Sequence, residues 1–318
     1  MTKVLVTGST GFVGSALLAE LQKLPDFRVV CAVRSAVSPA SDDVVSVGDI
    51  DGATDYSSAI TDVNVLVHSA ARAHIMNDEV ADPLAEYRKV NVVGSENLAR
   101  QAAAAGVKRF IYISSVKVSG ESTSGKDPYT ESMTAAPEDA YGQSKTEAEE
   151  ALKKIAEETG MELVIIRPPL VYGPGVKANF LSLLKLSKLS VPLPFGLVNN
   201  QRSMIYRENL VDFIIQCIDH PNAANQTFLI SDGHDLSLSH LIRTIRKAMN
   251  KPAWLLPVPV WLFKLAGKIT GKTAMVDRLV GDLQVDSSKA QRLLEWKPPY
   301  TVEEGIKATV VDFNNRKY

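Results

Sequence analysis

The chain has 318 residues, of which 45% are hydrophobic, and its 35 basic residues almost balance its 36 acidic residues. This length and hydrophobic content are sufficient for a large core and about two domains. The near-neutral charge excludes a chain-wide field that attracts nucleic acid or anionic lipid. We therefore expect no nucleic-acid partner, and we expect local groups to bind any anionic ligand.

The cysteines and the apolar segments indicate the compartment. Cys31 and Cys217 form no C-x-x-C pair, so we expect two reduced, buried thiols rather than a disulfide. The N-terminus carries no signal-peptide pattern, and no apolar run reaches the ~20 residues that a spanning helix needs. The sequence therefore predicts a cytoplasmic protein without a membrane-spanning segment.

A glycine-rich turn follows the first predicted strand, at residues 4–7. Without Cβ atoms, the turn can be tight, and a pyrophosphate can approach the amides that begin the helix predicted over 12–24. The spacing is G-x-x-G-x-x-G rather than G-x-G-x-x-G, and the glycines alone are also compatible with an ordinary turn. Their place directly after a strand favours a dinucleotide. The turn residues expected to contact it are Gly8, Gly11, Phe12, Val13 and Gly14.

Strands and helices alternate through the first half of the chain. Apolar runs predict strands over 28–34, 44–47, 63–68, 109–113 and 163–167. Helices are predicted over 56–60, 83–106 and 141–159. Right-handed crossovers then give a doubly wound parallel sheet, so we predict an α/β Rossmann fold with a smaller, partly interleaved α/β lobe. Besides the glycine turn, the residues expected at the ligand-binding edge of this sheet are Arg34, Asp49, Ala70, Ser115 and Pro168.

The pattern changes after Arg167, where prolines interrupt short segments. We predict a dinucleotide-binding domain over 1–167, with part of about 203–235 returning to it, and a substrate lobe over 168–202 and about 236–318. The run 254–269 is the most apolar segment. It predicts a helix packed in the smaller lobe, with a membrane-surface contact or a subunit interface as alternatives.

Tyr141 and Lys145 stand four residues apart, on one face of a predicted helix. A phenol with a pKa of about 10 is a poor acid or base at neutral pH, but a lysine cation beside it favours the phenolate and lowers the pKa. Ser115 ends the preceding strand and would supply a hydroxyl to the same substrate oxygen. Taken alone, the Tyr141–Lys145 spacing is also compatible with Tyr141 being an ordinary surface residue. Ser114 is a second candidate for the hydroxyl, less favoured than Ser115.

Together these segments resemble the extended short-chain dehydrogenase/reductase, or NAD-dependent epimerase/dehydratase, family. The resemblance rests on the glycine turn, Asn91-Val-Val-Gly94, Ile113-Ser-Ser115, Tyr141 to Lys145 and Arg167-Pro168. It implies NAD or NADP along the glycine turn, with Lys145 holding the nicotinamide ribose and Tyr141 transferring a proton. Ser115 acts with them on a hydroxyl or ketone. The further cofactor contacts expected are Arg34, Asp49, Ile50, Ala70, Ala71, Asn91 and Pro168.

The second half of the chain resembles family members that act on nucleotide-diphosphate sugars, so a UDP-sugar is the expected partner. By this resemblance Asn179 and Arg202 contact the diphosphate and Phe195 lies near the base. A guanidinium suits phosphate oxygens, although Arg202 alone is also compatible with a surface arginine. Leu170 departs from the pattern, because family members often carry asparagine there. The expected substrate contacts are Arg72, Lys117, Asn179, Phe180, Phe195 and Arg202.

Two positions bear on the reaction. Arg34 favours NADP(H), because it can pair with a 2′-phosphate; NAD(H) stays open, since an arginine here can also stack on adenine or face solvent. Val116-Lys117 follow Ser115 where dehydratases of the family carry Asp-Glu, which disfavours 4,6-dehydration. The sequence favours C4 reduction of a UDP-4-keto-6-deoxy-N-acetylhexosamine for surface polysaccharide such as O-antigen. The alternatives are a UDP-glucose or UDP-N-acetylglucosamine 4-epimerase and, from another class, a non-catalytic dinucleotide-binding regulator.

We predict no metal site, because no third ligand with suitable spacing accompanies His68 and His74. The resemblance also implies an assembly. Family members commonly dimerise through the two long helices that here contain Asn91 and Tyr141, so a homodimer is expected.

Overall fold

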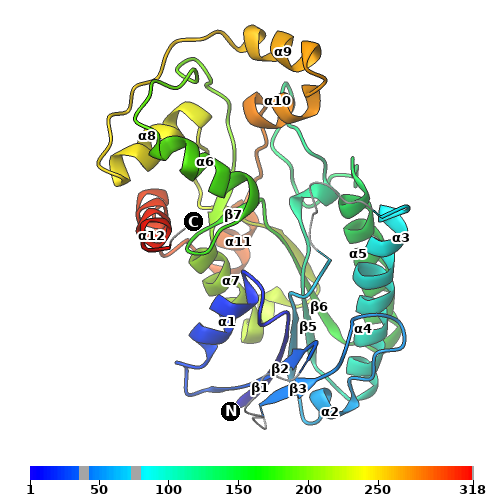
Figure 1. The fold of residues 1–318 in the computed structure, drawn as a ribbon. Helices are drawn as coiled ribbons and strands as arrows, with labels where there is room; N and C mark the ends of the chain where they lie inside the picture. The colour runs from blue at the N-terminus through cyan, green and yellow to red at the C-terminus, as the bar shows by residue number, and fades with distance from the viewer. Residues whose placement is uncertain (36–42, 73–79, 317–318) are drawn as a thin grey trace.

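A computed structural model describes residues 1–35, 43–72 and 80–316. Seven parallel strands form one sheet in the order β3-β2-β1-β4-β5-β6-β9 (Figure 1). The first six follow the doubly wound order, which confirms the predicted α/β Rossmann architecture. The strands are β1 (Thr2–Thr7), β2 (Phe27–Val33), β3 (Val44–Ser46), β4 (Val65–His68), β5 (Arg109–Ile113), β6 (Glu162–Arg167) and β9 (Gln226–Leu229).

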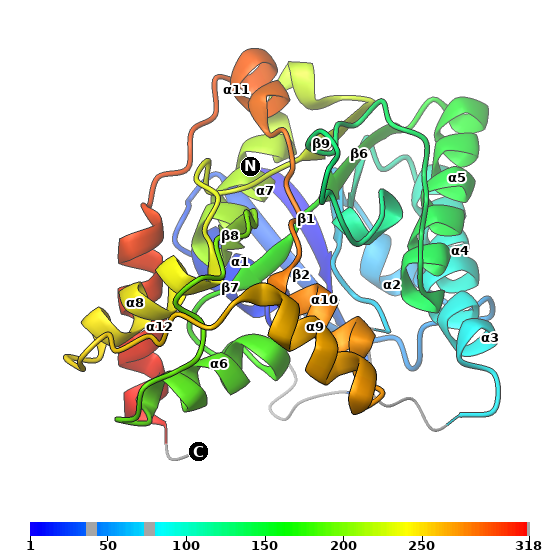
Figure 2. The same cartoon turned by 90° about the horizontal axis from the view of Figure 1, so that it is seen from above.

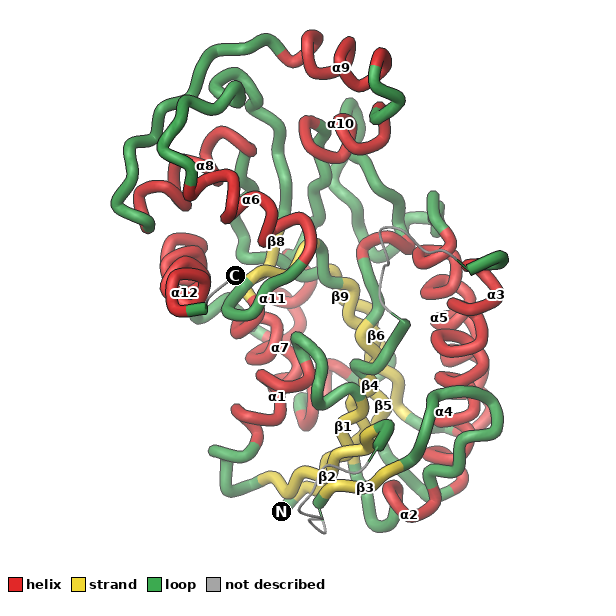
Figure 3. The backbone as a smooth tube through the Cα atoms, in the orientation of Figure 1, coloured by secondary structure: helices red, strands yellow, loops and turns green. Residues whose placement is uncertain are grey.

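Helices cover both faces of this sheet (Figure 3). Leu17, Leu210 and Leu294 belong to the core on one face, and Ile60, Leu98 and Leu152 to the core on the other. Burial on both faces explains why strands such as β2 are continuous apolar runs rather than alternating ones. The covering helices are α1 (Gly14–Leu21), α7 (Arg207–Asp219) and α11 (Ser288–Leu294) on the first face, and α2 (Ser57–Ile60), α4 (Gly94–Ala104) and α5 (Ala140–Thr159) on the second.

The helix predicted over 83–106 is not uniform. It consists of α3 (Pro83–Tyr87), a π-helical turn η1 (Arg88–Val93) and α4. A π-helical turn is wider than an α-helical one and is frequent at functional sites. Hydrophobic periodicity averages over 24 positions and does not reveal a single widened turn, so the sequence predicted one continuous helix.

The second lobe follows β6 and contains a small parallel sheet of β7 (Leu170–Tyr172) and β8 (Met204–Tyr206). The chain interleaves, because α7 and β9 come back to the main sheet after β8. The domain boundaries drawn from the sequence stay a prediction. The helices of this lobe are α6 (Ala178–Lys188), α8 (Leu238–Ala248), α9 (Val260–Ile269), α10 (Thr273–Val280) and α12 (Val302–Asn315).

The apolar run 254–269 forms a helix that packs in the lobe by one face only, through Val260 and Phe263. Helix α9 begins only at Val260, after Pro257 and Pro259, and Gly267 is its one fully buried residue. Figure 2 shows α9 and α10 projecting toward the viewer from the main sheet. Periodicity found the helix, but it could not show that most of the helix surface faces outward.

The two cysteines are free and buried, and burial raises the pKa of both thiols. Both therefore stay protonated, unreactive thiols at neutral pH. Within the ranges that the structure covers, no helix is long and apolar enough to cross a membrane.

Candidate active site

The glycine turn is closed tightly at the carboxyl end of β1. Gly11 N donates to the carbonyl oxygen of Gly8 at 2.8 Å, and Gly8 has a positive φ of 74°. A Cβ atom at Gly14 would lie 2.2 Å from Gly8 O, and one at Gly8 would lie 2.6 Å from Ala70 N. No side chain fits at either position, so the turn presents backbone at the start of α1, as a pyrophosphate site requires.

A cavity of about 370 Å³ opens beside this turn at the carboxyl ends of β1 and β2. Its lining includes four residues expected to contact a cofactor: Gly8, Arg34, Ile50 and Ala70. The bare glycine backbone and the apolar Ile50 suit the phosphates and the adenine of a dinucleotide, so the residues present fit such a group. Of the other expected contacts, Val13 caps the N-terminus of α1, and Ala71 is half-buried next to Ala70.

Two of the expected cofactor residues, Arg34 and Asp49, are largely exposed to solvent. Arg34 and Asp49 are 82% and 81% exposed, and Arg34 Nε is 3.3 Å from Asp49 Oδ1. The Phe12 ring packs against the core of the second lobe, and the guanidinium of Arg207, the first residue of α7, lies 5.2 Å from its centroid. Pro168 is buried after β6, and its carbonyl oxygen accepts from Val116 N at 3.0 Å. Through this contact Pro168 supports the segment after Ser115.

Asn91 is buried on η1 and joins two parts of the site. Its Oδ1 accepts from Arg72 N at 2.8 Å, and its Nδ2 donates to Arg72 O at 3.2 Å and to Ser144 Oγ at 3.0 Å. The segment after β4 is thereby attached to α5. The Arg72 guanidinium lies 5.4 Å from the ring centroid of Tyr87, a cation–π distance. Arg72 therefore lies against the aromatic pair of Tyr87 and Tyr141, whose centroids are 5.9 Å apart.

The three candidate catalytic residues lie on the segments where β5 ends and α5 begins. Asp139 caps α5 by accepting from Gly142 N at 2.7 Å, which orients the first turns of the helix. The Lys145 ammonium lies 6.0 Å from the ring centroid of Tyr141 and donates to Ile113 O at 2.9 Å. Ser115 follows Ile113 by two residues, and its Oγ accepts from Lys117 N at 3.2 Å.

Burial dominates the electrostatics of this group. Burial first, then Asp139 and Tyr87, raises the pKa of Tyr141 above its usual range. Burial lowers the pKa of Lys145 to about 7, against the opposing effect of Glu149. The expectation that Lys145 brings the phenol pKa toward neutrality is therefore not met by these side chains alone. The Tyr141 phenolate and the Lys145 ammonium would both lose hydration in this buried site. The cost of this loss outweighs the attraction between the two charges.

A chain of buried polar groups lies behind Lys145. The ammonium donates to the Tyr112 hydroxyl at 3.2 Å, and Ser95 hydrogen-bonds that hydroxyl. Ser95 Oγ is 2.9 Å from His68 Nε2, and Thr7 Oγ1 is 2.6 Å from His68 Nδ1. His68 is thus a satisfied core histidine that connects the end of β1 to the candidate catalytic lysine, Lys145. No group of three or more metal-ligating side chains occurs among the described residues, and His74 lies outside them.

We expect His68 to make the protein acid-sensitive. Burial, with a smaller effect of Lys145, lowers the pKa of His68 to about 3. The folded state keeps the imidazole neutral while the unfolded state protonates below about 6.5, so the free energy of unfolding falls as pH drops from about 6.5 toward 3. Each pKa unit is worth about 1.4 kcal/mol. Denaturant unfolding of wild type and His68→Asn from pH 7 to pH 3 measures the effect.

His68→Asn lacks this titration, so its stability curve should be flatter over the same range by several kcal/mol. The matched control is His240→Asn, because His240 is exposed. That variant should follow the wild-type curve. An unchanged slope in His68→Asn would show that the buried imidazole is protonated at little cost.

Ser114 and Ser115 have different surroundings. Ser114 is buried, and its Oγ donates to Glu149 Oε1 at 2.5 Å. The same carboxylate accepts from Arg167 at 2.9 Å and 2.5 Å in a two-pronged ion pair. Ser114 is therefore occupied in the core, whereas Ser115 is only half-buried. This favours Ser115 as the hydroxyl that meets a substrate.

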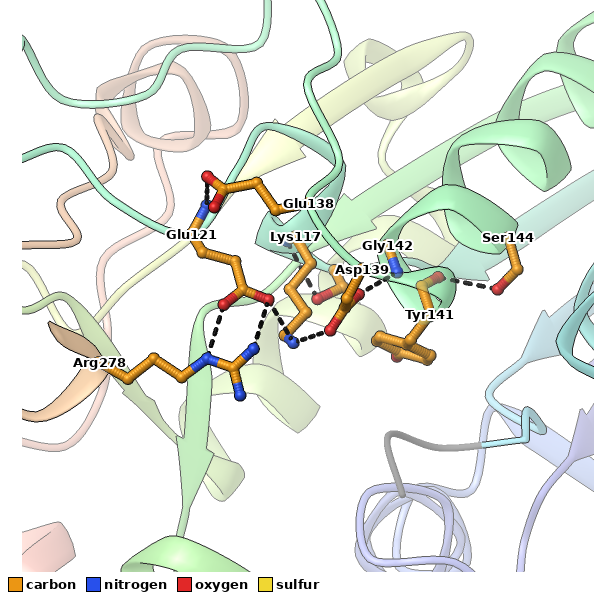
Figure 4. A network of polar contacts seen from close by, with 9 residues as sticks. Lys117, Glu121, Glu138, Asp139, Tyr141, Gly142, Ser144 and Arg278 are labelled. Carbon is orange, nitrogen blue, oxygen red and sulfur yellow. Dashed lines mark hydrogen bonds and ion pairs between the residues drawn. The ribbon is translucent and has the colours of Figure 1, made fainter. Parts of the chain in front are cut away.

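A polar network connects the start of α5 to α10 of the second lobe (Figure 4). Lys117 contacts both Asp139 and Glu121, the latter at 2.8 Å. Arg278 Nε donates to the second oxygen of Glu121 at 2.7 Å. Lys117, expected to contact substrate, is thus held between two carboxylates beside the site. The network therefore connects the two lobes beside the segment that carries Ser115.

The remaining expected substrate residues are spread over the second lobe. Asn179 is exposed near the start of α6. Phe195 stacks on Phe263 at 5.5 Å, and Arg202 Nη1 donates to the carbonyl oxygen of Arg278 at 2.8 Å. The Phe180 side chain is buried and stacks on Tyr172 at 5.4 Å, and the expected substrate contact of this residue stays a prediction. Its ring is part of the lobe's core.

Several residues of the site were not found from the sequence. The contact of Glu121 with Arg278 joins positions 157 residues apart, and no local pattern reveals it. Tyr112 had a weak signal, since it places a hydroxyl at the end of a strand just before the serine pair. Asp139 had a better one, because an aspartate immediately before a predicted helix is typical of an N-cap.

Comparison with known proteins decides the family. A family model described as the NAD dependent epimerase/dehydratase family matches residues 4–231. The chain belongs to this family. The match runs from β1 through the candidate catalytic residues to the end of β9, so the resemblance inferred from the motifs is confirmed.

Two relatives and one solved structure extend the comparison of this epimerase/dehydratase family member. A Vibrio cholerae protein named UDP-glucose 4-epimerase is 52% identical over 317 residues, covering 98% of this chain and 97% of the relative. An Escherichia coli O157:H7 protein named N-acetyl-alpha-D-glucosaminyl-diphospho-ditrans,octacis-undecaprenol 4-epimerase is 29% identical, covering 96% and 94%. The fold resembles the Bacillus cereus UDP-glucuronic acid 4-epimerase in complex with NAD, with a TM-score of 0.78, 21% identity and 99% coverage of both chains.

Proposed function

We propose that the protein is a UDP-hexose 4-epimerase that works with NAD(H), with UDP-glucose and UDP-galactose as its substrate pair. The observation that carries the proposal is that Tyr141, Lys145 and Ser115 lie where β5 ends and α5 begins. It occurs in a chain that is 52% identical, over nearly its full length, to a protein named UDP-glucose 4-epimerase.

Tyr141 is the residue that exchanges a proton with the oxygen on C4 of the sugar. Ser115 hydrogen-bonds the same oxygen and orients it toward the phenol. A dinucleotide held at the glycine turn and by Lys145 would supply reversible hydride transfer at C4, and a positively charged nicotinamide there would favour the Tyr141 phenolate. Tyr141 gives the proton back when the C4 alcohol of the other configuration forms.

Lys145 holds the cofactor side of the site. Its ammonium is fixed by Ile113 O and the Tyr112 hydroxyl, so it has a single position from which to meet a ribose hydroxyl. A pKa lowered to about 7 means that the cation is fully present only below neutral pH. A bound ribose that accepts hydrogen bonds would favour the charged form and restore it.

For the cofactor, the surroundings of Arg34 favour NAD(H). A 2′-phosphate that reached the guanidinium would also meet the carboxylate of Asp49, which lies 3.3 Å from Arg34 Nε. Like charges at this separation oppose binding, whereas a neutral ribose does not suffer from them. The preference for NADP(H) drawn from Arg34 alone stays a prediction, and the family description names NAD.

The other functions considered from the sequence are less well supported. Reduction of a UDP-4-keto-6-deoxy-N-acetylhexosamine needs the same three residues, but the Vibrio cholerae relative bears the name of an epimerase. A non-catalytic regulator has no use for Ser115, Tyr141 and Lys145 in one place. A role in surface polysaccharide and a homodimer through α4 and α5 stay predictions.

Incubating the purified protein with UDP-glucose, without added dinucleotide or reductant, tests the proposal. We expect UDP-galactose to form, because an epimerase regenerates its cofactor in each cycle. Acid-released cofactor, identified by mass, should be NAD(H). The absence of UDP-galactose, together with NADPH consumption on a UDP-4-keto sugar, would instead establish the reductase.

A further inference from the structure

Helix α9 carries two apolar faces. On the inner face, Phe263 stacks on Phe195, and a Cβ atom at Gly267 would lie 2.9 Å from Val276 of α10. On the outer face, Trp261, Leu265 and Ile269 follow at intervals of four residues and form one stripe. These three side chains are 62%, 46% and 77% exposed. The packed residues of α9 thus lie on its inner face, whereas the outer stripe stays largely exposed.

The stripe is the centre of a wider apolar surface. Seven of the eighteen large hydrophobic side chains exposed in the described chain lie between residues 254 and 275. Two of them are tryptophans, which are favoured where an apolar surface meets a polar one. Single exposed hydrophobic residues need no explanation, but such a concentration in one segment marks an interaction surface.

All the charged side chains of the segment around α9 are positive. Residues 251–276 contain four lysines and no aspartate or glutamate. Lys264 and Lys268 are exposed on α9 and, at 3.6 residues per turn, lie on the flank between its inner face and the outer stripe. Lys272 is exposed directly after the helix. The chain as a whole carries a net charge of only -1, so this positive cluster is a local feature.

The position of α9 leaves its outer face accessible. Figure 1 places α9 at the tip of the second lobe, away from β1, β2 and β3, and Figure 2 shows it apart from α4 and α5. The surface is therefore separate from the helices through which a homodimer is expected. A symmetric contact between two α9 helices would also bring lysines against lysines, with no acidic side chain in the segment to pair with them.

We propose that α9 lies flat in the surface of an anionic phospholipid bilayer and attaches the protein to it. Trp261, Leu265 and Ile269 would enter the boundary between headgroups and acyl chains, while Lys264, Lys268 and Lys272 would meet the lipid phosphates. An apolar stripe with tryptophan, flanked by lysines that reach outward along their apolar stems, is the pattern of an interfacial helix. The attachment is peripheral and reversible, and it does not depend on which sugar the enzyme uses.

Vesicle co-sedimentation of the full-length protein tests this proposal. We expect binding to phosphatidylcholine vesicles that contain phosphatidylglycerol, little binding to pure phosphatidylcholine, and release by salt. Each lysine near an anionic surface strengthens binding roughly fivefold. Lys264→Glu/Lys268→Glu should therefore weaken binding by more than an order of magnitude, and Trp261→Ser/Leu265→Ser should abolish it.

Matched controls separate the surface from general effects. Val311→Ser on α12 also replaces an exposed apolar residue, and Lys247→Glu/Lys307→Glu makes the same change in net charge at exposed positions. Both should bind vesicles like the wild type, and all variants should retain epimerase turnover. Failure of the wild type to bind anionic vesicles would overturn the proposal. Unchanged vesicle binding by Trp261→Ser/Leu265→Ser would also overturn it. If light scattering then showed that this variant had lost a dimer, the stripe would be a subunit contact instead.

Discussion

Replacing Tyr141 by phenylalanine is expected to lower kcat for C4 epimerisation by roughly 10²–10⁴-fold, the usual contribution of a positioned proton-transfer group. The change removes only the hydroxyl. The ring keeps its contact with Tyr87, and the glycine turn and Lys145 are untouched, so dinucleotide content should stay unchanged. Steady-state rates with UDP-glucose, together with cofactor released per protein molecule, measure both effects.

Tyr300→Phe is the matched control for this variant. Tyr300 is 46% exposed and packs against Tyr206 away from Ser115 and Lys145. Loss of its hydroxyl should leave kcat unchanged. If Tyr141→Phe turned over UDP-glucose as fast as Tyr300→Phe, Tyr141 could not be the proton-transfer residue. A variant that lost its cofactor would instead show that the phenol hydroxyl contributes to dinucleotide binding.

Replacing Arg167 by methionine is expected to lower the free energy of unfolding by about 3–5 kcal/mol, because it leaves the Glu149 carboxylate buried without its partner. The side chains of Arg167 and Glu149 are 6% and 2% exposed. Ser114 would then be the remaining hydrogen-bond donor to this carboxylate, and the half-exposed Lys153 ammonium, 3.8 Å from Glu149 Oε2, the remaining cation beside it. Urea unfolding at pH 7 measures the loss.

Two further variants test whether the burial of the ion pair causes the expected loss in the free energy of unfolding. Arg28→Met breaks an ion pair with Asp43 in which both side chains are 51% exposed, and it should cost less than about 1 kcal/mol. Arg167→Met/Glu149→Leu removes both buried charges and should recover much of the stability. Equal, small losses in Arg167→Met and Arg28→Met would contradict the expected cost of the uncompensated carboxylate.

The buried ion pair also bears on the geometry of catalysis. Glu149 lies one helical turn after Lys145 on α5, and Arg167 ends β6. Their contact, with Ser114 bonded to the same carboxylate, connects α5, β5 and β6 at the edge of the sheet where Ser115 begins the next segment. The stability of this connection and the placement of the candidate catalytic hydroxyl of Ser115 therefore depend on the same side chains.

Local patterns in the sequence were sufficient for the sheet and for the family. Apolar runs located the strands, because strands buried on both faces leave a continuous signal. The glycine turn was recognisable because Gly8 and Gly14 meet backbone atoms where any side chain would collide. The four-residue interval between Tyr141 and Lys145 placed both on one face of α5, since that interval is a property of the helix itself.

Contacts between distant segments could not be predicted in this way. The sequence indicated a tyrosine made more acidic by a neighbouring lysine. The structure instead shows burial raising the pKa of Tyr141 and lowering that of Lys145. The side chains that contact these groups come from other elements: Tyr87 of α3 packs against Tyr141, and Tyr112 of β5 contacts Lys145.

The sequence by itself therefore determined the fold class, the dinucleotide turn and the chemical identity of the candidate catalytic groups, because each depends on spacing within one element. Only the tertiary structure decided which groups meet across elements. It buried Phe180, paired Arg34 with Asp49, joined Arg278 to Glu121, and turned the stripe of Trp261 outward. Each of these outcomes depends on how helices and loops pack against one another, which local periodicity does not encode.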